Sequence, residues 1–189
     1  MSSYAELEVT TNFSFLRGAS HPEEMALQAA AFGYTAIGIT DRNSLAGVVR
    51  AHVTAKEAGI KLCVGARLDL VDGVSLLAYP TDRAAYGRLS RLITTGRRRA
   101  PKGECEIGRQ DVLEWGEGVI FLVVSPTDLA IPVLGVQLNE LITAFPGNCY
   151  IVANHLLRGD DTARLACLAD LAAAHGMLLV AANDAHMHS

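Results

Sequence analysis

The sequence predicts an α/β fold built on a mostly parallel sheet. Short apolar runs such as Thr35–Thr40 alternate with longer segments of helical periodicity, and these runs carry apolar residues on both faces. Strands of this kind, separated by helices, form parallel sheets that helices cover on both sides. Six or seven such strand–helix units fit either a closed barrel or an open doubly wound sheet. Periodicity alone does not choose between the two.

The expected strands are apolar runs bounded by turn residues or by a helix. They are Ala5–Thr10, Thr35–Thr40, Leu62–Leu70, Val74–Ala78, Val119–Val124, Cys149–Ala153 and Leu178–Ala182. The pair Asp72-Gly73 marks a turn between the third and the fourth of them.

The expected helices are Ser20–Phe32, Ser44–Ala58, Asp82–Thr95, Gln137–Ala144 and Asp160–His175. Ser20 and Glu23 have the spacing of a capping box at the start of the first helix. Glycines follow several of these segments, as is common where helices end. The stretch Gly96–Gly108 is basic at its start and contains Pro101, so we expect a surface loop there.

Length and composition predict one globular cytoplasmic domain that spans residues 1–189. Half of the residues are hydrophobic and 19% are charged, which excludes a disordered chain. The net charge of -4 argues against a free-standing DNA-coating protein, which is usually basic. No apolar run approaches the roughly 20 residues that span a bilayer. The chain stops just after a strand without a closing helix, which suggests a fragment of a longer protein.

The cysteines carry no sign of a metal site or a disulfide framework. They are widely spread, without a CxxC pair and without ligand-like spacing to histidine. Reduced structural thiols are therefore expected at Cys63, Cys105, Cys149 and Cys167.

Polar residues at the ends of the first three strands are candidate site residues, because sites in α/β folds gather where strands end. Glu8 and Thr10 share one side of the first strand. Asp41 follows the second strand, where it would accept backbone hydrogen bonds, pair with Arg42, or cap the next helix. Arg67 lies on the third strand, where an ion pair is favoured over phosphate binding.

The end of the last strand is the only cluster with metal-ligand residue types at ligand spacing. Asp184 and His186 lie two apart, so they would face the same way on an extended segment. A carboxylate and an imidazole suit zinc, iron or manganese, but two ligands hold a metal poorly. His155 could supply a third ligand. The simpler interpretation is a pair of hydrogen-bonded loop residues.

One basic cluster, made of Arg97, Arg98 and Arg99 with Lys102 nearby, is a candidate phosphate-binding segment. A solvated loop is the simpler alternative. No aromatic residues interleave with these arginines to form a base-stacking platform.

Five segments, in order along nearly the whole chain, resemble a known family. They are Tyr4–Gly18, Thr40–Gly47 (TDRNSLAG), Ala58–Arg67, Leu76–Leu92 and Asn183–His186. Together they are similar to the amino-terminal PHP domain (polymerase and histidinol phosphatase family) of bacterial C-family DNA polymerases, the DNA polymerase III alpha-subunit-like enzymes. Arg17–Glu24 (RGASHPEE) and Tyr79–Leu89 (YPTDRAAYGRL) are closer to the error-prone branch than to the replicative branch.

The resemblance implies a distorted seven-stranded (β/α) barrel of TIM-like, PHP type. In intact members, strand ends hold a cluster of metal ions that hydrolyses phosphoesters. Here the His-x-His pair of the family falls on Glu8 and Thr10, and further ligands fall on Arg42, Arg67 and Arg17. Ligands expected near Val74 and Pro126 are not visible. Asp184 and His186 match the closing motif.

These differences predict a degenerate metal pocket without catalytic residues or bound metal. Arginine has no lone pair to donate and stays protonated, so it repels divalent ions. We expect Arg42 and Arg67 to form ion pairs with Glu8, Asp41 or Asp184. A salt-bridge network would then replace the metal cluster.

Three functions follow from the resemblance. The first is a non-catalytic structural and interaction domain of an error-prone, translesion polymerase that acts in DNA replication, repair and damage tolerance. The second is a residual metal-dependent phosphoesterase or proofreading exonuclease that uses Asp184, His186 and His155. The third is a phosphate or nucleic-acid binding module that uses the arginines. The expected partners are the other domains of the same polymerase, with DNA and other translesion or replication proteins as further candidates and no membrane. Mg²⁺ would serve only the parent polymerase.

Overall fold

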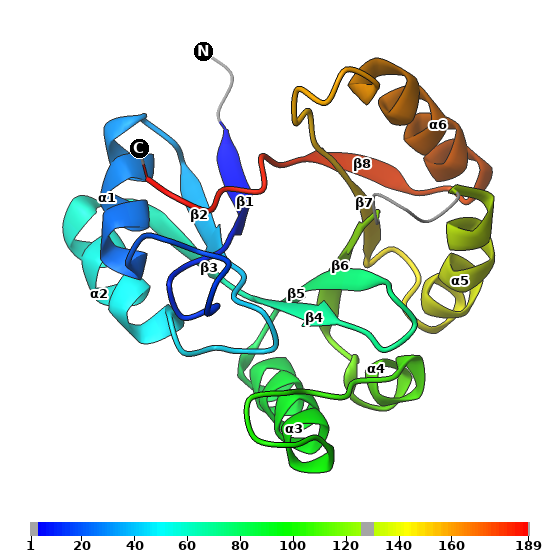
Figure 1. The fold of residues 1–189 in the computed structure, drawn as a ribbon, viewed down its shortest axis with the longest axis horizontal. Coiled ribbons are helices and arrows are strands. Elements are labelled where there is room, and N and C mark those ends of the chain that lie inside the picture. Colours follow the sequence, from blue (N-terminus) through cyan, green and yellow to red (C-terminus); the bar gives the residue numbers. More distant parts are fainter. Residues whose placement is uncertain (1–3, 126–130, 189) are drawn as a thin grey trace. The chain divides into compact units, whose positions relative to one another are not determined.

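The structure is a computed structural model that describes residues 4–125 and 131–188. The chain divides into two compact units. The first unit combines the chain up to Arg67 with the segment from Ala182 onward, and the second unit is Leu68–Ala181. Figure 1 labels the elements of both units.

The first unit is built on a three-stranded parallel sheet in the order β1-β2-β3. Its strands are β1 (Ala5–Val9), β2 (Ala36–Ile39) and β3 (Lys61–Val64). The helices α1 (Pro22–Ala31) and α2 (Val48–Ala58) connect them and lie together on one side of this sheet (Figure 1). This arrangement leaves the opposite face of β1 for other contacts.

The core of the first unit lies between the sheet and the two helices. β2 is buried along its whole length because it is the central strand. The helices contribute small residues, which allow close packing of helix against sheet. The core residues are Val9, Met25, Ala26, Ala29, Ile37, Ile39, Ala51, Ala55 and Ile60. Val9 points into this core, so its neighbours Glu8 and Thr10 point to the other face of β1.

The second unit is built on a five-stranded sheet in the order β4-β5-β6-β7-β8. Its strands are β4 (Ala66–Asp69), β5 (Ser75–Pro80), β6 (Val119–Val124), β7 (Cys149–Ala153) and β8 (Leu178–Ala181). β5 and β6 are antiparallel, whereas β6, β7 and β8 are parallel. The helices of this unit are α3 (Arg83–Arg99), α4 (Arg109–Trp115), α5 (Ile131–Ala144) and α6 (Asp161–Ala174).

The α/β class predicted from the sequence is confirmed, with corrections to the sheet. The expected strand Leu62–Leu70 is two strands, β3 and β4, that end and begin on either side of Gly65. β5 pairs with β6 in antiparallel orientation, which interrupts the expected parallel order. The reason is the short turn at Asp72-Gly73, which reverses the chain direction just before β5. Strand pairing in the described residues gives two open sheets, so the closed seven-stranded barrel remains a prediction.

The helices differ from the predictions mainly at their ends. α1 begins one residue later than the predicted capping box requires: the Glu24 carboxylate, not that of Glu23, accepts from the His21 backbone N–H at 2.7 Å. α2 begins at Val48 instead of Ser44. α3 extends into the predicted loop Gly96–Gly108 and ends at Arg99. The helix α4 was not predicted. None of the helices in the described ranges is long and apolar enough to cross a bilayer.

Candidate functional site

The residues of the predicted metal pocket all lie in the first unit, on the side of β1 that faces away from the helices. They are Glu8, Thr10, Asp41, Arg42, Arg67, Asp184 and His186. A short segment after β8, Asn183–His188, runs beside β1 and brings the closing motif to it. The Ala185 backbone N–H donates to the Glu8 carbonyl at 2.8 Å, and the Thr10 N–H donates to the Ala185 carbonyl at 2.9 Å. Glu8, Thr10 and Asp184 are therefore neighbours, as the strand-end argument predicts.

Arg67 is the central side chain of this pocket. Its Nη1 lies 3.0 Å from Glu8 Oε1 and 3.9 Å from Asp184 Oδ1. The Glu8 side chain is 1% exposed and that of Arg67 12% exposed, so this ion pair is largely shielded from solvent. The sequence predicts ion pairs of Arg42 and Arg67 with Glu8, Asp41 or Asp184, and for Arg67 the carboxylates in reach are those of Glu8 and Asp184.

The backbone fixes where Arg67 lies. Its N–H donates to the Asp41 carbonyl at 3.1 Å, and its own carbonyl accepts from the Asn43 N–H at 2.7 Å. These bonds form a parallel bridge between Arg42 and Arg67. Both arginines are thus brought to the same strand end, where Arg42 is only partly exposed.

Asp41 forms a second polar centre, which is completely buried. Its carboxylate accepts from the Thr11 backbone N–H at 2.9 Å, from Thr11 Oγ1 at 2.8 Å and from Ser14 Oγ at 2.7 Å. The Ser14 hydroxyl also accepts from the Arg42 backbone N–H at 2.9 Å. Bonding to a backbone amide, one of the three roles left open by the sequence, is seen here. The N-cap of α2 is instead Gly47, which packs against this carboxylate.

Asp184 and His186 contact each other, which differs from the extended geometry that the sequence predicts. Asp184 has a φ of 49°, so the chain turns at this residue. His186 Nε2 lies 2.9 Å from Asp184 Oδ1, and His186 Nδ1 lies 3.0 Å from the Arg17 carbonyl. Both partners are acceptors, so a ring nitrogen that donates a hydrogen bond to either of them offers no lone pair to a metal.

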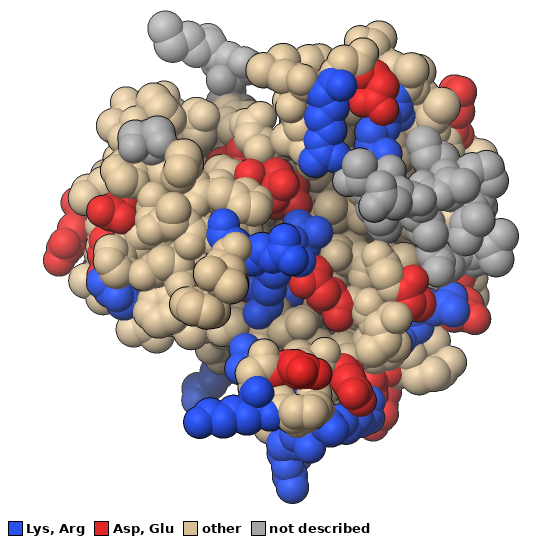
Figure 2. Space-filling model, viewed as in Figure 1, with Lys and Arg blue, Asp and Glu red and all other residues tan. Residues whose placement is uncertain are grey.

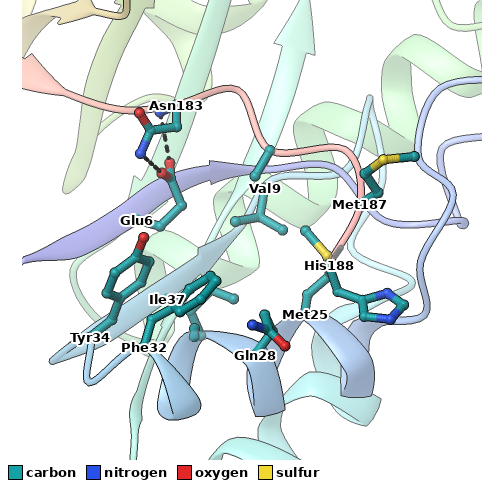
Figure 3. Close-up of a pocket in the computed structure, with 12 residues that line it drawn as sticks. Glu6, Val9, Met25, Gln28, Phe32, Tyr34, Ile37, Asn183, Met187 and His188 are labelled. Atoms are coloured by element: carbon teal, nitrogen blue, oxygen red, sulfur yellow. Dashed lines mark hydrogen bonds between the residues drawn. The ribbon is translucent and has the colours of Figure 1, made fainter.

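The sequence analysis missed a buried carboxylate on β1, that of Glu6, which precedes Glu8 on the same face of the strand. Glu6 accepts from Tyr4 Oη at 2.9 Å, from the Glu8 backbone N–H at 2.9 Å and from Asn183 Nδ2 at 2.9 Å. Figure 3 shows the two bonds between Glu6 and Asn183 at the edge of a cavity of about 110 Å³. Burial, reinforced by the Glu6 carboxylate, raises the pKa of Tyr4 well above its usual range. The alternation of Glu6 with Glu8 was the available signal.

The residues in this pocket do not fit the metal cluster that the resemblance implies. Among the described residues, no three His, Cys, Asp or Glu side chains group in a way that could hold a metal ion. The Arg67 guanidinium lies between the carboxylates of Glu8 and Asp184, and a second cation there would be repelled. Val74 is a buried apolar residue, and Pro126 lies outside the described residues.

The other predicted site residues belong to the second unit. Arg97, Arg98 and Arg99 form the last turn of α3, which corrects the predicted loop. Arg99 Nη1 donates to Asp111 Oδ2 at 2.6 Å, so this arginine joins α3 to α4. His155 follows β7 in the second unit, and a ligand set that combines it with Asp184 and His186 remains a prediction.

The chain resembles known proteins over almost its whole length. It is 50% identical over 186 residues to an error-prone DNA polymerase of Caulobacter vibrioides, and 47% identical over 186 residues to error-prone DNA polymerase 2 of Agrobacterium fabrum. Both alignments cover 98% of this chain but 17% of the polymerase. The chain thus spans less than a fifth of the length of these relatives.

Two solved structures share the fold. An amidohydrolase from Chromobacterium violaceum, which has bound sulfate and no metal, superposes with a TM-score of 0.77 at 17% identity, covering 98% of this chain and 88% of that one. A protein from Bifidobacterium adolescentis, named for an inferred metal-dependent phosphoesterase activity, superposes with a TM-score of 0.76 at 18% identity and the same coverage. At these identities the likeness shows the fold alone.

The family model of the PHP domain matches residues 6–137, a range that contains Glu8, Asp41 and Arg67. Because that match covers well over half of the chain, this protein belongs to the PHP domain family.

Proposed function

We propose that this PHP domain is a non-catalytic structural and interaction domain of an error-prone DNA polymerase, in which ion pairs replace the metal cluster. The observation that carries the proposal is the position of Arg67. Its guanidinium contacts Glu8 and lies near Asp184, two positions where the resemblance places metal ligands. A fixed cation there neutralises the carboxylates that a metal would otherwise neutralise.

The remaining contacts support a structural role for the pocket. Asp41, which aligns with a ligand segment of the family, is saturated by hydroxyl and amide donors from the loop after β1. His186 and Asp184 are bonded to each other. Each group is thus used to hold strand ends and loops together, which is what a buried, satisfied polar network does.

The parent protein supplies the chemistry in this proposal. The relatives that match over 98% of this chain are error-prone DNA polymerases. Nucleotidyl transfer with Mg²⁺ would be carried out by carboxylates elsewhere in such a polymerase, during cytoplasmic translesion synthesis in DNA repair. Its other domains, and through them DNA and replication proteins, are the proposed partners. The distorted seven-stranded barrel belongs to the same proposal, supported by the bridges Val9↔Ala185 and Arg42↔Arg67.

Metal content of the purified protein tests the proposal directly. The protein is incubated with zinc and then with manganese, desalted, and measured by elemental mass spectrometry beside a variant with Asp184→Asn and His186→Gln. Both proteins are expected to retain far less than one equivalent. Stoichiometric metal in the wild type that disappears in the variant would establish the residual phosphoesterase site instead, and hydrolysis of a phosphoester substrate would be measured next.

A second candidate function, binding of a DNA backbone, is favoured by one observation on the second unit. Figure 2 shows Lys and Arg side chains gathered over α3, with acidic side chains among them. No acidic residue lies within α3, and its arginines are Arg83, Arg88, Arg91, Arg97, Arg98 and Arg99. Arginine on an exposed helix suits phosphate contacts.

Salt dependence distinguishes this candidate from a solvated surface. DNA affinity would be measured by fluorescence anisotropy over a salt series, for the wild type and for Arg97→Ser/Arg98→Ser. A shallower dependence of affinity on salt in the variant is expected if these side chains contact phosphates. Exposed Lys56 on α2, changed to Ser, is the matched control from the other unit. Equal salt slopes for all three proteins would remove α3 from consideration.

A further inference from the structure

The loop Asn12–Gly18, here called the Phe15 loop, presents a cluster of large apolar side chains to solvent. Phe15 is 84% exposed, Leu16 is 86% exposed and Phe13 is 40% exposed. Single exposed apolar residues are normal on a protein surface, but contiguous ones mark interaction sites. The loop follows β1, so it belongs to the same part of the first unit as the Asp41 centre.

The Phe15 loop is held in one conformation by its own backbone. Ser14 N–H donates to the Thr11 carbonyl at 2.9 Å, and the Ser14 carbonyl accepts from Arg17 and Gly18 at 2.9 Å and 3.2 Å. Ser14 Oγ is anchored on buried Asp41. Gly18 approaches so closely that an added Cβ would lie 2.2 Å from the Thr11 carbonyl oxygen. The apolar side chains are therefore presented in a fixed arrangement, which lowers the entropic cost of binding.

Leu16 has a strained backbone conformation, although its side chain is exposed and gains little from packing within this domain. Its φ is 60°, in the left-handed region that disfavours a bulky residue. Glycine or asparagine would adopt this φ with less strain, and the leucine side chain gains almost no internal burial in return. Strain of this kind persists where a residue has a function, so the exposed and strained Leu16 points to a contact with something outside the described residues.

We propose that the Phe15 loop docks into an apolar depression on another domain of the same polymerase chain. This inference rests on the part of the proposed function that places the domain within a polymerase. This chain covers 17% of its relatives, which are therefore about six times longer. In a polymerase of that length, most of the protein surface that could receive the loop belongs to other domains. An acidic rim around the depression would complement exposed Arg17, and Arg50, whose guanidinium lies 5.9 Å from the Phe13 ring centroid.

A domain of the same chain is favoured over a separate partner because the proposed polymerase tethers its other domains to this one. Tethering raises the effective concentration of an apolar acceptor without further contacts.

Site-specific photo-crosslinking in the full-length polymerase tests the docking. Benzoyl-phenylalanine replaces Phe15, the protein is irradiated, and the crosslinked peptides are identified by mass spectrometry at several protein concentrations. We expect a crosslink within one chain, to residues outside 1–189, with a yield that does not change on dilution. Crosslinks that join two chains and weaken on dilution, or no crosslink at all, would overturn the proposal.

Substitutions at Leu16 and Leu27 show whether the docking depends on the loop. Leu16→Gly in the crosslinking background should lower the yield several-fold, while relieving backbone strain. Leu27→Gln is the control, because Leu27 is also exposed but lies on α1. An unchanged yield in the Leu16→Gly protein, or an equal loss in both, would contradict a specific role for the loop. The crosslink does not depend on metal content, so retained metal would refute the structural role of the pocket while leaving the docking intact.

Discussion

At the scale of single residues, the ion pair between Arg67 and Glu8 is the strongest candidate for a replacement of the metal cluster. We predict that Arg67→Ala lowers the free energy of unfolding by about 3–5 kcal/mol, because it leaves Glu8 as a buried carboxylate without its cation. Urea denaturation of the wild type and the variant, followed by circular dichroism, measures this loss.

The matched control for this prediction is the exposed pair between Arg50 and Glu23. Their side chains are 46% and 32% exposed, so solvent screens the interaction. Arg50→Ala should change the free energy of unfolding by no more than about 1 kcal/mol. Equal effects of the two substitutions would mean that the Arg67 pair contributes no more than a surface salt bridge, and the replacement of the metal by ion pairs would then lose its support.

Substitution by alanine should have opposite effects on stability at two of the glycines. Gly18→Ala should destabilise the protein by about 1–3 kcal/mol or more, since the new Cβ would meet the rigid backbone of Thr10 and Thr11. Gly87→Ala should stabilise it by roughly 0.5–1 kcal/mol, because Gly87 lies within α3 with no atom near its Cβ position. Thermal unfolding of both variants would show the difference in sign. A stable Gly18→Ala protein would mean that the Phe15 loop is not rigid.

Much of the polar centre could be predicted from the sequence because strand ends in this fold class converge. Glu8, Asp41 and Arg67 each follow or lie within an apolar run, and the structure joins them by direct contacts or shared backbone bonds. Glu6 and Ser14 were missed for a physical reason. A glutamate within a strand usually faces solvent, and the tertiary donors that satisfy Glu6 come from a segment about 180 residues away, which local patterns do not reveal.

At the scale of elements, the contact between α3 and α4 predicts a pH-dependent stability. The hydrogen bond from Arg99 holds the pKa of Asp111 below its usual range, and the Gly108 N–H adds to this effect, although burial opposes it. A carboxyl whose folded pKa is depressed stabilises the fold above its unfolded pKa of about 3.9. That contribution is lost as the pH falls through the lower folded pKa.

The measurement compares the wild type with Asp111→Asn by urea denaturation from about pH 7 down to about pH 3. The wild type should be more stable at neutral pH, and the difference should shrink below about pH 4. Glu104→Gln is the control, because Glu104 is exposed on the neighbouring loop. A difference between wild type and Asp111→Asn that stays constant over the whole range would show that the ionised carboxylate is not what joins the two helices.

Helix and strand ends were less predictable than the elements themselves. Pro101 and the glycines around it suggested that helical structure stops before Gly96, but α3 continues to Arg99 because Gly96 is buried against Ile107 and Cys105. Tertiary packing there outweighs the low helix propensity of glycine. The apolar run Leu62–Leu70 reads as one strand, yet β3 and β4 belong to different sheets. Periodicity does not encode which partner a strand chooses.

At the scale of the whole molecule, the sequence similarity and the pocket chemistry lead to one functional prediction. The relatives are error-prone polymerases, and the segment Asp184–His186 resembles the closing motif of the family. A residual proofreading site would depend on these two side chains. In the proposed structural domain they bond to each other and to nearby backbone, and Asp184 also lies near the Arg67 guanidinium.

We therefore predict that Asp184→Asn/His186→Gln leaves the error rate of the full-length polymerase unchanged. Primer extension over a template of known sequence, with the products sequenced, measures misincorporation for wild type and variant. The expected cost is confined to stability, since the bonds from His186 to Asp184 and Arg17 are weakened. Leu27→Gln is the control for the effect of a substitution outside the pocket, because Leu27 lies on the exposed face of α1. An error rate that rises only in the Asp184/His186 variant would show that these residues still remove mismatched nucleotides, and the structural role proposed for the pocket would be wrong.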